Sequence, residues 1–198
     1  MKQTDVKCIN AITVYGASSR TISQRYLNAA RNLGAEIAKA GRPLVCGGGA
    51  TGVMGAAIDG ATATGGEAIG VIPEFMVKRK WHNPALSNMI VTESMHVRKD
   101  TMARLASAVV ACPGGIGTFE ELMEIITWRD LGLWNGNIVI LNTDGYYDPL
   151  LHMLAKAAEE NFMRSAGPEL WSVAHTPEEA VRLALRPTEE SKGFTAKS

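Results

Sequence analysis

The chain has 198 residues, of which 46% are hydrophobic and 20% charged, and its formal net charge at pH 7 is zero. This length predicts one globular domain with a substantial core. Lysines and arginines are not gathered into the basic patch that a nucleic-acid surface normally carries. No apolar run approaches the roughly 20 residues that a membrane-spanning helix needs. The sequence therefore indicates a soluble protein that binds neither nucleic acid nor a membrane.

The three cysteines, Cys8, Cys46 and Cys112, show no metal-ligand spacing, and one would stay unpaired if the other two formed a disulfide. Reduced thiols in a cytoplasmic protein are the simplest interpretation, with Cys46 and Cys112 at the ends of predicted strands. Residues 1–16 lack the apolar core and the small-residue cleavage site of a signal peptide. We therefore expect a cytoplasmic location.

Short apolar runs alternate with amphipathic stretches along the chain, which is the pattern of a parallel sheet covered by helices. The runs that predict strands are 11–16, 43–49, 67–73, 89–92, 106–115 and 137–142. Helices are expected over 23–41, 52–65, 95–107, 117–134 and 148–162, a loop or lid over 74–88, and closing segments over 171–176 and 177–185. The pattern predicts a single doubly wound α/β domain over residues 1–187, followed by a flexible tail over 188–198.

Three predicted strands end in sequences that suit an anion: YGASSR (15–20), CGGGATGVMG (46–55) and CPGGIGTFEE (112–121). In an open α/β sheet such ends can converge on one crevice. Glycines let main-chain N–H groups approach a ligand, and a helix N-terminus adds partial positive charge. Neither glycine loop is a P-loop or carries the usual dinucleotide fingerprint. Tight turns also need glycine, so each loop alone leaves a structural role open, whereas the three together favour a ligand site.

Two carboxylates, Glu120 and Glu121, fall in what is expected to be the first turn of the helix after the third loop. Thr118 and Glu121 have the spacing of a capping box, in which each side chain satisfies a backbone donor of the other residue. A structural cap is therefore the main alternative to a catalytic role for Glu121. Glu120 and Glu124 could likewise form a solvated helix face.

Arg98 shifts this balance, because it falls on the same apolar helical stripe as Met102 and Leu105. A guanidinium on an inward stripe needs a carboxylate or an anion nearby. One interpretation is a structural Arg–Glu pair. The other is a site in which Thr118 and the glycine N–H groups hold a phosphate while Glu121 stabilises an oxocarbenium-like state during cleavage of an N-glycosidic bond. A nucleoside monophosphate has this polarity.

Three motifs resemble those of the Lonely Guy family, the cytokinin-activating nucleotide phosphoribohydrolases. PGGIGTFEE (113–121) fits the pattern PGGxGTxxE, GGGATGVMG (47–55) is similar to GGGxxGLMG, and MHVRKDTM (95–102) resembles MHxRKxxM. The stretches 126–134 and 141–151 are similar to those that follow in the family. Many members have been labelled lysine decarboxylases, but nothing in this sequence indicates a pyridoxal phosphate site.

The resemblance implies a Rossmann-like homodimer, without cofactor or metal, that hydrolyses the N-glycosidic bond of plain or N6-substituted adenosine monophosphate to free base and ribose 5-phosphate. Arg98 and Glu121 match the catalytic pair of the family. The residues that match its phosphate loop and its further nucleotide contacts are Gly114, Gly115, Gly117, Thr118, Lys99, Glu120 and Thr127. From the other two strand ends we expect contacts from Ser18, Gly48 and Gly49.

One departure from the family concerns the loop before MHxRK, where members often carry a glutamate and this chain has Arg79-Lys80-Trp81. Lys80 then replaces an acidic contact, which bears on base or prenyl specificity more than on the bond cleaved. Among the four histidines, only His96 is expected near the site, and a structural role at its helix start is favoured. The alternative function is a nucleotide-binding sensor or carrier without turnover, which would not require the Arg98 and Glu121 pair.

Overall fold

The computed structural model describes residues 8–163 and 167–188 of the chain. Within these residues, seven parallel strands form one sheet in the order β4-β3-β2-β1-β5-β6-β7. The strands are β1 (Ala11–Tyr15), β2 (Leu44–Cys46), β3 (Ala68–Pro73), β4 (Asn88–Thr92), β5 (Ala106–Ala111), β6 (Asn137–Leu141) and β7 (Ser172–Ala174). The helices are α1 (Gln24–Lys39), α2 (Gly52–Ala63), α3 (Glu74–Lys78), α4 (Met95–Leu105), α5 (Ile116–Asp130), α6 (Asp148–Glu159), α7 (Gly167–Leu170) and α8 (Pro177–Ala184).

The order of the strands places a topological switch point between β1 and β5. From β1 the chain winds outward to β4, then returns to the other side of β1 and winds through β5 to β7. The predicted doubly wound α/β fold is therefore confirmed. In such sheets a ligand crevice forms beyond the carboxyl ends of the strands on either side of the switch point. Here the two ends are level, because Tyr15 lies opposite Ala111 in the register of β1 and β5.

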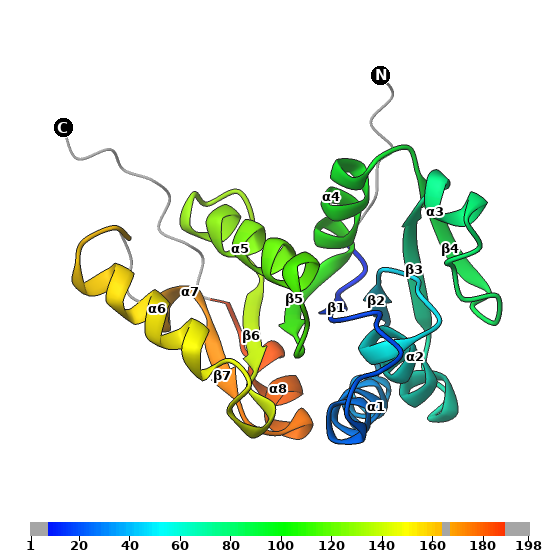
Figure 1. Cartoon of the computed structure of the whole chain (residues 1–198), viewed down its shortest axis with the longest axis horizontal. Helices are drawn as coiled ribbons and strands as arrows, with labels where there is room; N and C mark the ends of the chain where they lie inside the picture. The colour runs from blue at the N-terminus through cyan, green and yellow to red at the C-terminus, as the bar shows by residue number, and fades with distance from the viewer. Residues whose placement is uncertain (1–7, 164–166, 189–198) are drawn as a thin grey trace.

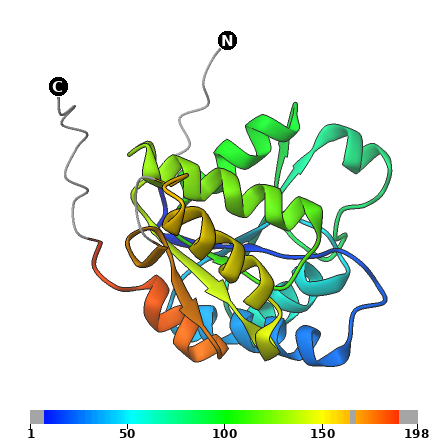
Figure 2. The same ribbon diagram turned by 60° about the vertical axis from the view of Figure 1, so that its left-hand side comes forward.

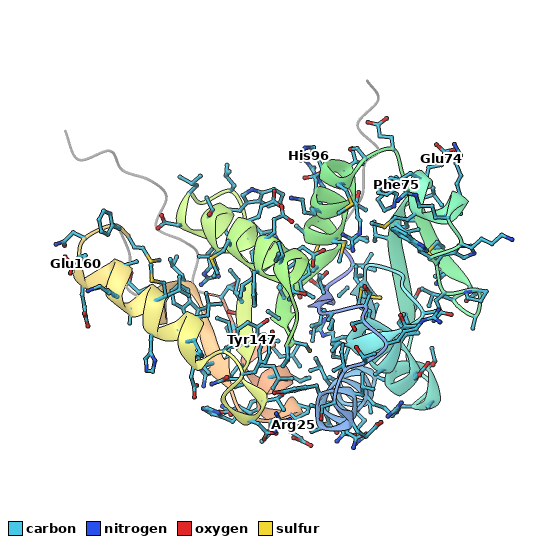
Figure 3. All side chains as sticks on the ribbon, viewed as in Figure 1. Arg25, Glu74, Phe75, His96, Tyr147 and Glu160 are labelled. Carbon is cyan, nitrogen blue, oxygen red and sulfur yellow. The ribbon has the colours of Figure 1, made fainter. Side chains whose placement is uncertain are left out.

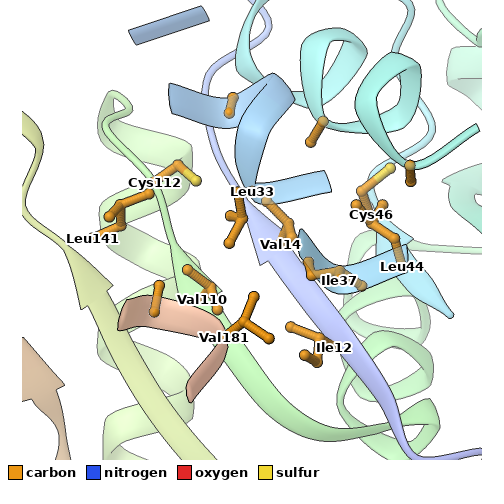
Figure 4. Close-up of a cluster of buried hydrophobic side chains, with 14 of the residues drawn as sticks. Ile12, Val14, Leu33, Ile37, Leu44, Cys46, Val110, Cys112, Leu141 and Val181 are labelled. Atoms are coloured by element: carbon orange, nitrogen blue, oxygen red, sulfur yellow. The ribbon is translucent and has the colours of Figure 1, made fainter. Parts of the chain in front are cut away.

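Helices cover both faces of the sheet, which explains why the central strands are apolar on both sides. In Figures 1 and 2, α1, α2 and α8 lie on one face, whereas α4, α5 and α6 lie on the other. Alternate residues of β1 serve the two faces: Ile12 and Val14 pack toward α1, as Figure 4 shows, while Ala11 and Tyr15 belong to the core under α4 and α5. This sheet holds the strand ends in place beneath the candidate site.

Element boundaries differ from the sequence expectation mainly beside the glycines. The strands expected to extend to residues 49 and 115 end at Cys46 and Ala111, because the glycines that follow leave the ladder and form loops. Residues 74–78, expected in a loop, form the short helix α3. The helix α7 and a 3₁₀ turn at Thr143–Gly145 were not predicted from the sequence.

The tail expected over 188–198 lies outside the described residues from position 189 on. Among the described residues, no helix combines the length and the apolar character needed to cross a bilayer.

Candidate active site

A cavity of about 830 Å³ opens where the carboxyl ends of β1, β2, β3 and β5 approach the starts of α2, α4 and α5. Its position is that of the crevice predicted from the strand order. The expected site residues that line it are Ser18, Gly49, Arg98, Gly115, Gly117, Thr118, Glu120 and Glu121. The cavity therefore draws on all three of the loops that the sequence singled out.

The loop between β5 and α5 has the features of an anion site at one end of the cavity. Gly115 is the N-cap of α5, so the first N–H groups of the helix have no partner within it and carry its partial positive charge. Tyr146 donates its hydroxyl to Gly114 O at 2.5 Å, and Tyr147 donates to Cys112 O at 2.7 Å. These two bonds hold the loop carbonyls, and a Cβ added at Gly114 would clash with Thr118 Oγ1.

The capping box that was the structural alternative for Thr118 and Glu121 does not form. The helix α5 begins at Ile116, three residues earlier than a capping box with Thr118 as N-cap would place it, because Gly115 takes the N-cap position without any side-chain cap. Thr118 is thus the third helical residue, and Glu120 and Glu121 stand in the second turn instead of the first. This shift moves both carboxylates away from the N–H groups of the loop, so they do not compete with a bound phosphate for them.

Arg98 and Glu121 form a buried ion pair in the wall of the cavity. Arg98 Nη1 donates to Glu121 Oε1 at 2.9 Å, and the two residues are only 7% and 9% exposed. Arg98 Nε also donates to Val71 O at 3.0 Å, and a Cβ added at Gly47 would clash with Arg98 Nη2. Burial raises the pKa of Glu121, while the neighbouring guanidinium lowers it less strongly. The arrangement presents a desolvated carboxylate beside the anion site.

Lys99 occupies a place different from the one expected, because it does not line the cavity. Its ammonium is buried between α4 and α5, where it pairs with Glu120 and lies 3.0 Å from Glu124 Oε1. Burial lowers the pKa of Lys99, but the hydrogen bonds to the two glutamates outweigh this effect and leave it raised. Glu120 and Glu124 are thus not a purely solvated face. Lys99 orients Glu120, which is half-exposed and reaches the cavity.

Three further expected residues lie outside the cavity lining. Thr127 is exposed, and its hydroxyl donates to Met123 O one turn earlier in α5. Gly114 lies behind the loop, against Thr118. Gly48 has φ +71°, a conformation that favours glycine, and its carbonyl accepts from Asn83 N at 2.8 Å. These glycines shape the loops without facing the cavity.

The expectation that His96 is the histidine near the site is wrong. His96 is exposed at the start of α4, as Figure 3 shows, whereas His82 lines the cavity. His82 reaches the cavity because the chain after α3 folds back, so that His82 forms an antiparallel bridge with Gly49. Arg20 and the methionines Met54, Met76 and Met95 also line the cavity and were missed. Their signal was the position of their segments, directly after β1, β2, β3 and β4.

Within the described residues, no three His, Cys, Asp or Glu side chains are grouped so that they could hold a metal ion. The ionisable groups that line the cavity are Arg20, Lys80, His82, Arg98, Glu120 and Glu121. The site therefore offers N–H donors, three cations, a histidine and two carboxylates for chemistry on a ligand that carries an anionic group.

Residues 54–184 match the protein family described as "Possible lysine decarboxylase". The chain is 38% identical over 170 residues to the probable cytokinin riboside 5′-monophosphate phosphoribohydrolase LOGL2 of Oryza sativa subsp. japonica, covering 86% of this chain and 70% of that protein. It is 37% identical over 171 residues to the cytokinin riboside 5′-monophosphate phosphoribohydrolase LOG3 of Arabidopsis thaliana, covering 86% of this chain and 80% of that protein.

Solved structures with a similar fold include carriers. A molybdenum cofactor binding protein from the phototrophic bacterium Rippkaea orientalis has a TM-score of 0.67 at 25% identity, covering 88% of this chain and 94% of that chain. A Moco carrier protein from Chlamydomonas reinhardtii has a TM-score of 0.66 at 25% identity, covering 87% of this chain and 93% of that one. The fold is thus shared between hydrolases and carriers.

Proposed function

The chain belongs to the family of cytokinin riboside 5′-monophosphate phosphoribohydrolases, and we propose that Arg98 and Glu121 catalyse N-glycosidic hydrolysis in it. The substrate is plain or N6-substituted adenosine 5′-monophosphate, and the products are the free base and ribose 5-phosphate. The observation that carries the proposal is the buried pair of Arg98 and Glu121 in the same cavity wall as the glycine loop before α5.

In the proposed mechanism the phosphate binds the free N–H groups at the start of α5 together with Thr118. This contact sets the ribose beside Glu121, whose carboxylate stabilises positive charge as the bond between C1′ and the base breaks. The bonding electrons leave with the base, which takes up one proton, and the oxygen of a water molecule bonds to C1′ and gives up one proton, so that the water is consumed without a net change in protons. Arg98 orients the carboxylate, because its guanidinium is held by Val71 O and packs against Gly47.

Desolvation is the reason why this pair suits the reaction. A charge in a water-poor wall acts on a nearby cation more strongly than the same charge in water. Burial of Glu121 therefore strengthens its effect on an oxocarbenium-like state, and Arg98 offsets part of the cost of that burial.

We also propose a cytoplasmic location and a homodimeric assembly. Support for the location comes from the cysteines, because Cys46 and Cys112 are buried free thiols. Support for a dimer comes from Leu131 and Leu133, whose side chains are exposed directly after α5. The mass of the protein in solution, measured by light scattering, tests the assembly.

A carrier without turnover is the second candidate, favoured by the solved structures of molybdenum cofactor proteins. Against it stand the higher identity to hydrolases, 37–38% compared with 25%, and the Arg98 and Glu121 pair. Binding alone does not require a desolvated carboxylate next to an anion site.

The test incubates the pure protein with AMP and with isopentenyladenosine 5′-monophosphate and measures free base and ribose 5-phosphate. Glu121→Gln is expected to bind both nucleotides yet lose most turnover, because the shape of the wall survives and its charge does not. Glu160→Gln, the same chemical change at the end of α6, is the matched control and should keep the wild-type rate. Binding of both nucleotides without release of base would favour the carrier.

A further inference from the structure

The length of the cavity indicates where the base of a bound nucleotide lies, if the proposed function holds. The cavity extends from the end of β5 across β1 and β2 to the end of β3. Neighbouring strands are about 4.8 Å apart, so these three spacings amount to roughly 14 Å. A nucleotide whose phosphate binds the loop after β5, with its ribose at Glu121, therefore extends its base toward the residues that follow β3.

The chain after β3 folds back against the loop after β2 and places an aromatic ring in the cavity wall. Trp81 lines the cavity and is 53% exposed, and the guanidinium of Arg79 lies 5.1 Å from its ring centroid. Its backbone is anchored on both sides, since Trp81 N donates to Met76 O at 3.1 Å and the following His82 is bridged to Gly49. An indole that is held by its backbone and by a cation can offer its free surface to a planar base.

The charges along the cavity are unevenly compensated. Arg98 is paired with Glu121, and Glu120 is paired with Lys99. Among the residues that the structure describes, Lys80 makes no ion pair, although it lines the cavity beside Trp81. Arg20 is also without an ion pair within the described residues, but it follows β1, next to β5, where the phosphate of a ligand would face it. Within the described part of the chain, Lys80 is therefore the cation without an ion pair at the base end of the cavity.

Lys80 also adopts a strained backbone conformation. Its φ is +59°, in the left-handed region that non-glycine residues rarely adopt. Such positions persist where the surrounding structure holds them, and here Lys80 N donates to Val77 O at 2.9 Å. The bond and the bridge beyond it keep Lys80 and Trp81 at the cavity.

We propose that Trp81 and Lys80 form the base subsite, and that Lys80 lets this site take 6-oxopurine nucleoside 5′-monophosphates as well as adenine nucleotides. An ammonium has three donors and no acceptor. A 6-oxopurine presents two acceptors, O6 and N7, along one edge, whereas adenine presents the N6 amino donor beside N7. Lys80 therefore has one more partner on an oxopurine and faces a donor on adenine.

The first experiment compares kcat/KM for IMP and AMP in the wild type, in Lys80→Met and in Lys80→Glu. The wild type is expected to cleave both nucleotides. Lys80→Met keeps the length of the side chain and should lower the IMP to AMP ratio about tenfold, and Lys80→Glu should lower it further because a carboxylate accepts from N6. Lys78→Met, a control on the exposed side of α3, should leave the ratio unchanged. A ratio that is the same in all variants would overturn the proposal.

The second experiment tests the aromatic ring. Trp81→Ala should raise KM for both nucleotides about tenfold, and Trp81→Phe should retain most of the affinity. An unchanged KM together with a changed mass in light scattering would assign Trp81 to a subunit interface and overturn its role in stacking.

Calorimetry separates this inference from the hydrolysis on which it rests. A wild type that binds IMP and AMP with a preference dependent on Lys80, yet cleaves neither, supports the base subsite and refutes the proposed reaction. A wild type that cleaves and binds AMP, but neither cleaves nor binds IMP, refutes the base preference and leaves the reaction in place.

Discussion

Removing Arg98 is expected to affect stability and activity by separable amounts. The pair of Arg98 and Glu121 is buried and closed at 2.9 Å, and Arg98 also satisfies Val71 O. Breaking a buried pair by removing one partner costs about 3–5 kcal/mol, because the remaining charge is left uncompensated. In a chain of this size, about 1 kcal/mol shifts the melting midpoint by about 2–4 °C. Arg98→Ala should therefore lower the midpoint by about 6–20 °C and abolish hydrolysis of AMP.

The double variant Arg98→Met/Glu121→Leu decides between a structural and a catalytic role. Replacing both members of a buried pair by apolar groups of similar volume is often neutral or stabilising, so its midpoint should return to within about 5 °C of the wild type. Its activity should remain absent. The assays are calorimetric melting and release of ribose 5-phosphate from AMP at saturating substrate. A double variant that hydrolyses AMP at the wild-type rate would show that the catalytic assignment is wrong.

Three smaller perturbations test the surroundings of the pair. Gly114→Ala should weaken binding of ribose 5-phosphate in calorimetry, because the new methyl group meets Thr118, whereas Gly115→Ala has open space and should not disturb the loop by contact. Burial raises the pKa of Glu121, so this carboxylate is protonated at a higher pH than an exposed glutamate. When the pH is lowered, log kcat should therefore fall with a midpoint above pH 4.5. A midpoint below pH 4.5 would contradict this reasoning. Lys99→Met should lower the free energy of unfolding in urea by about 1–2 kcal/mol, since one of its two carboxylate partners is half-exposed, and a variant of unchanged stability would show that the pairs are solvated.

The sequence predicted most of the fold because strand and helix periodicities are local properties. The apolar runs that contain β1, β3 and β5 are buried on both faces, and that pattern is typical of a parallel sheet alone. The predicted ends of β2 and β5 were wrong, because both strands are followed by glycines and glycine is compatible with a strand as well as with a loop. The short helix α3 was missed because five residues are too few for a helical period to emerge.

For the site, the sequence could identify chemical types but not all partners. Arg98 was recognised as an inward-facing cation because it shares a stripe with Met102, and its need for a partner followed from charge burial. The sequence left two roles open for Glu121, a helix cap or the partner of Arg98, because the two roles differ only in where α5 begins. Lys99 matches a nucleotide contact of the family in sequence, but in the structure its side chain pairs with the glutamates of α5.

By itself, then, the sequence determined the class of fold and the three glycine-containing strand ends, because each depends on residues close together along the chain, and it supplied Arg98 and Glu121 as the proposed residues for an N-glycosidic hydrolysis. Only the tertiary structure decided which of them meet. It paired Arg98 with Glu121, withdrew Lys99 from the cavity, and brought Trp81 and His82 into its wall in place of His96. The physical reason is that helix starts and the return of the chain after β3 are set by packing between distant segments, and a shift of three residues at the start of α5 changes which partners a side chain can reach.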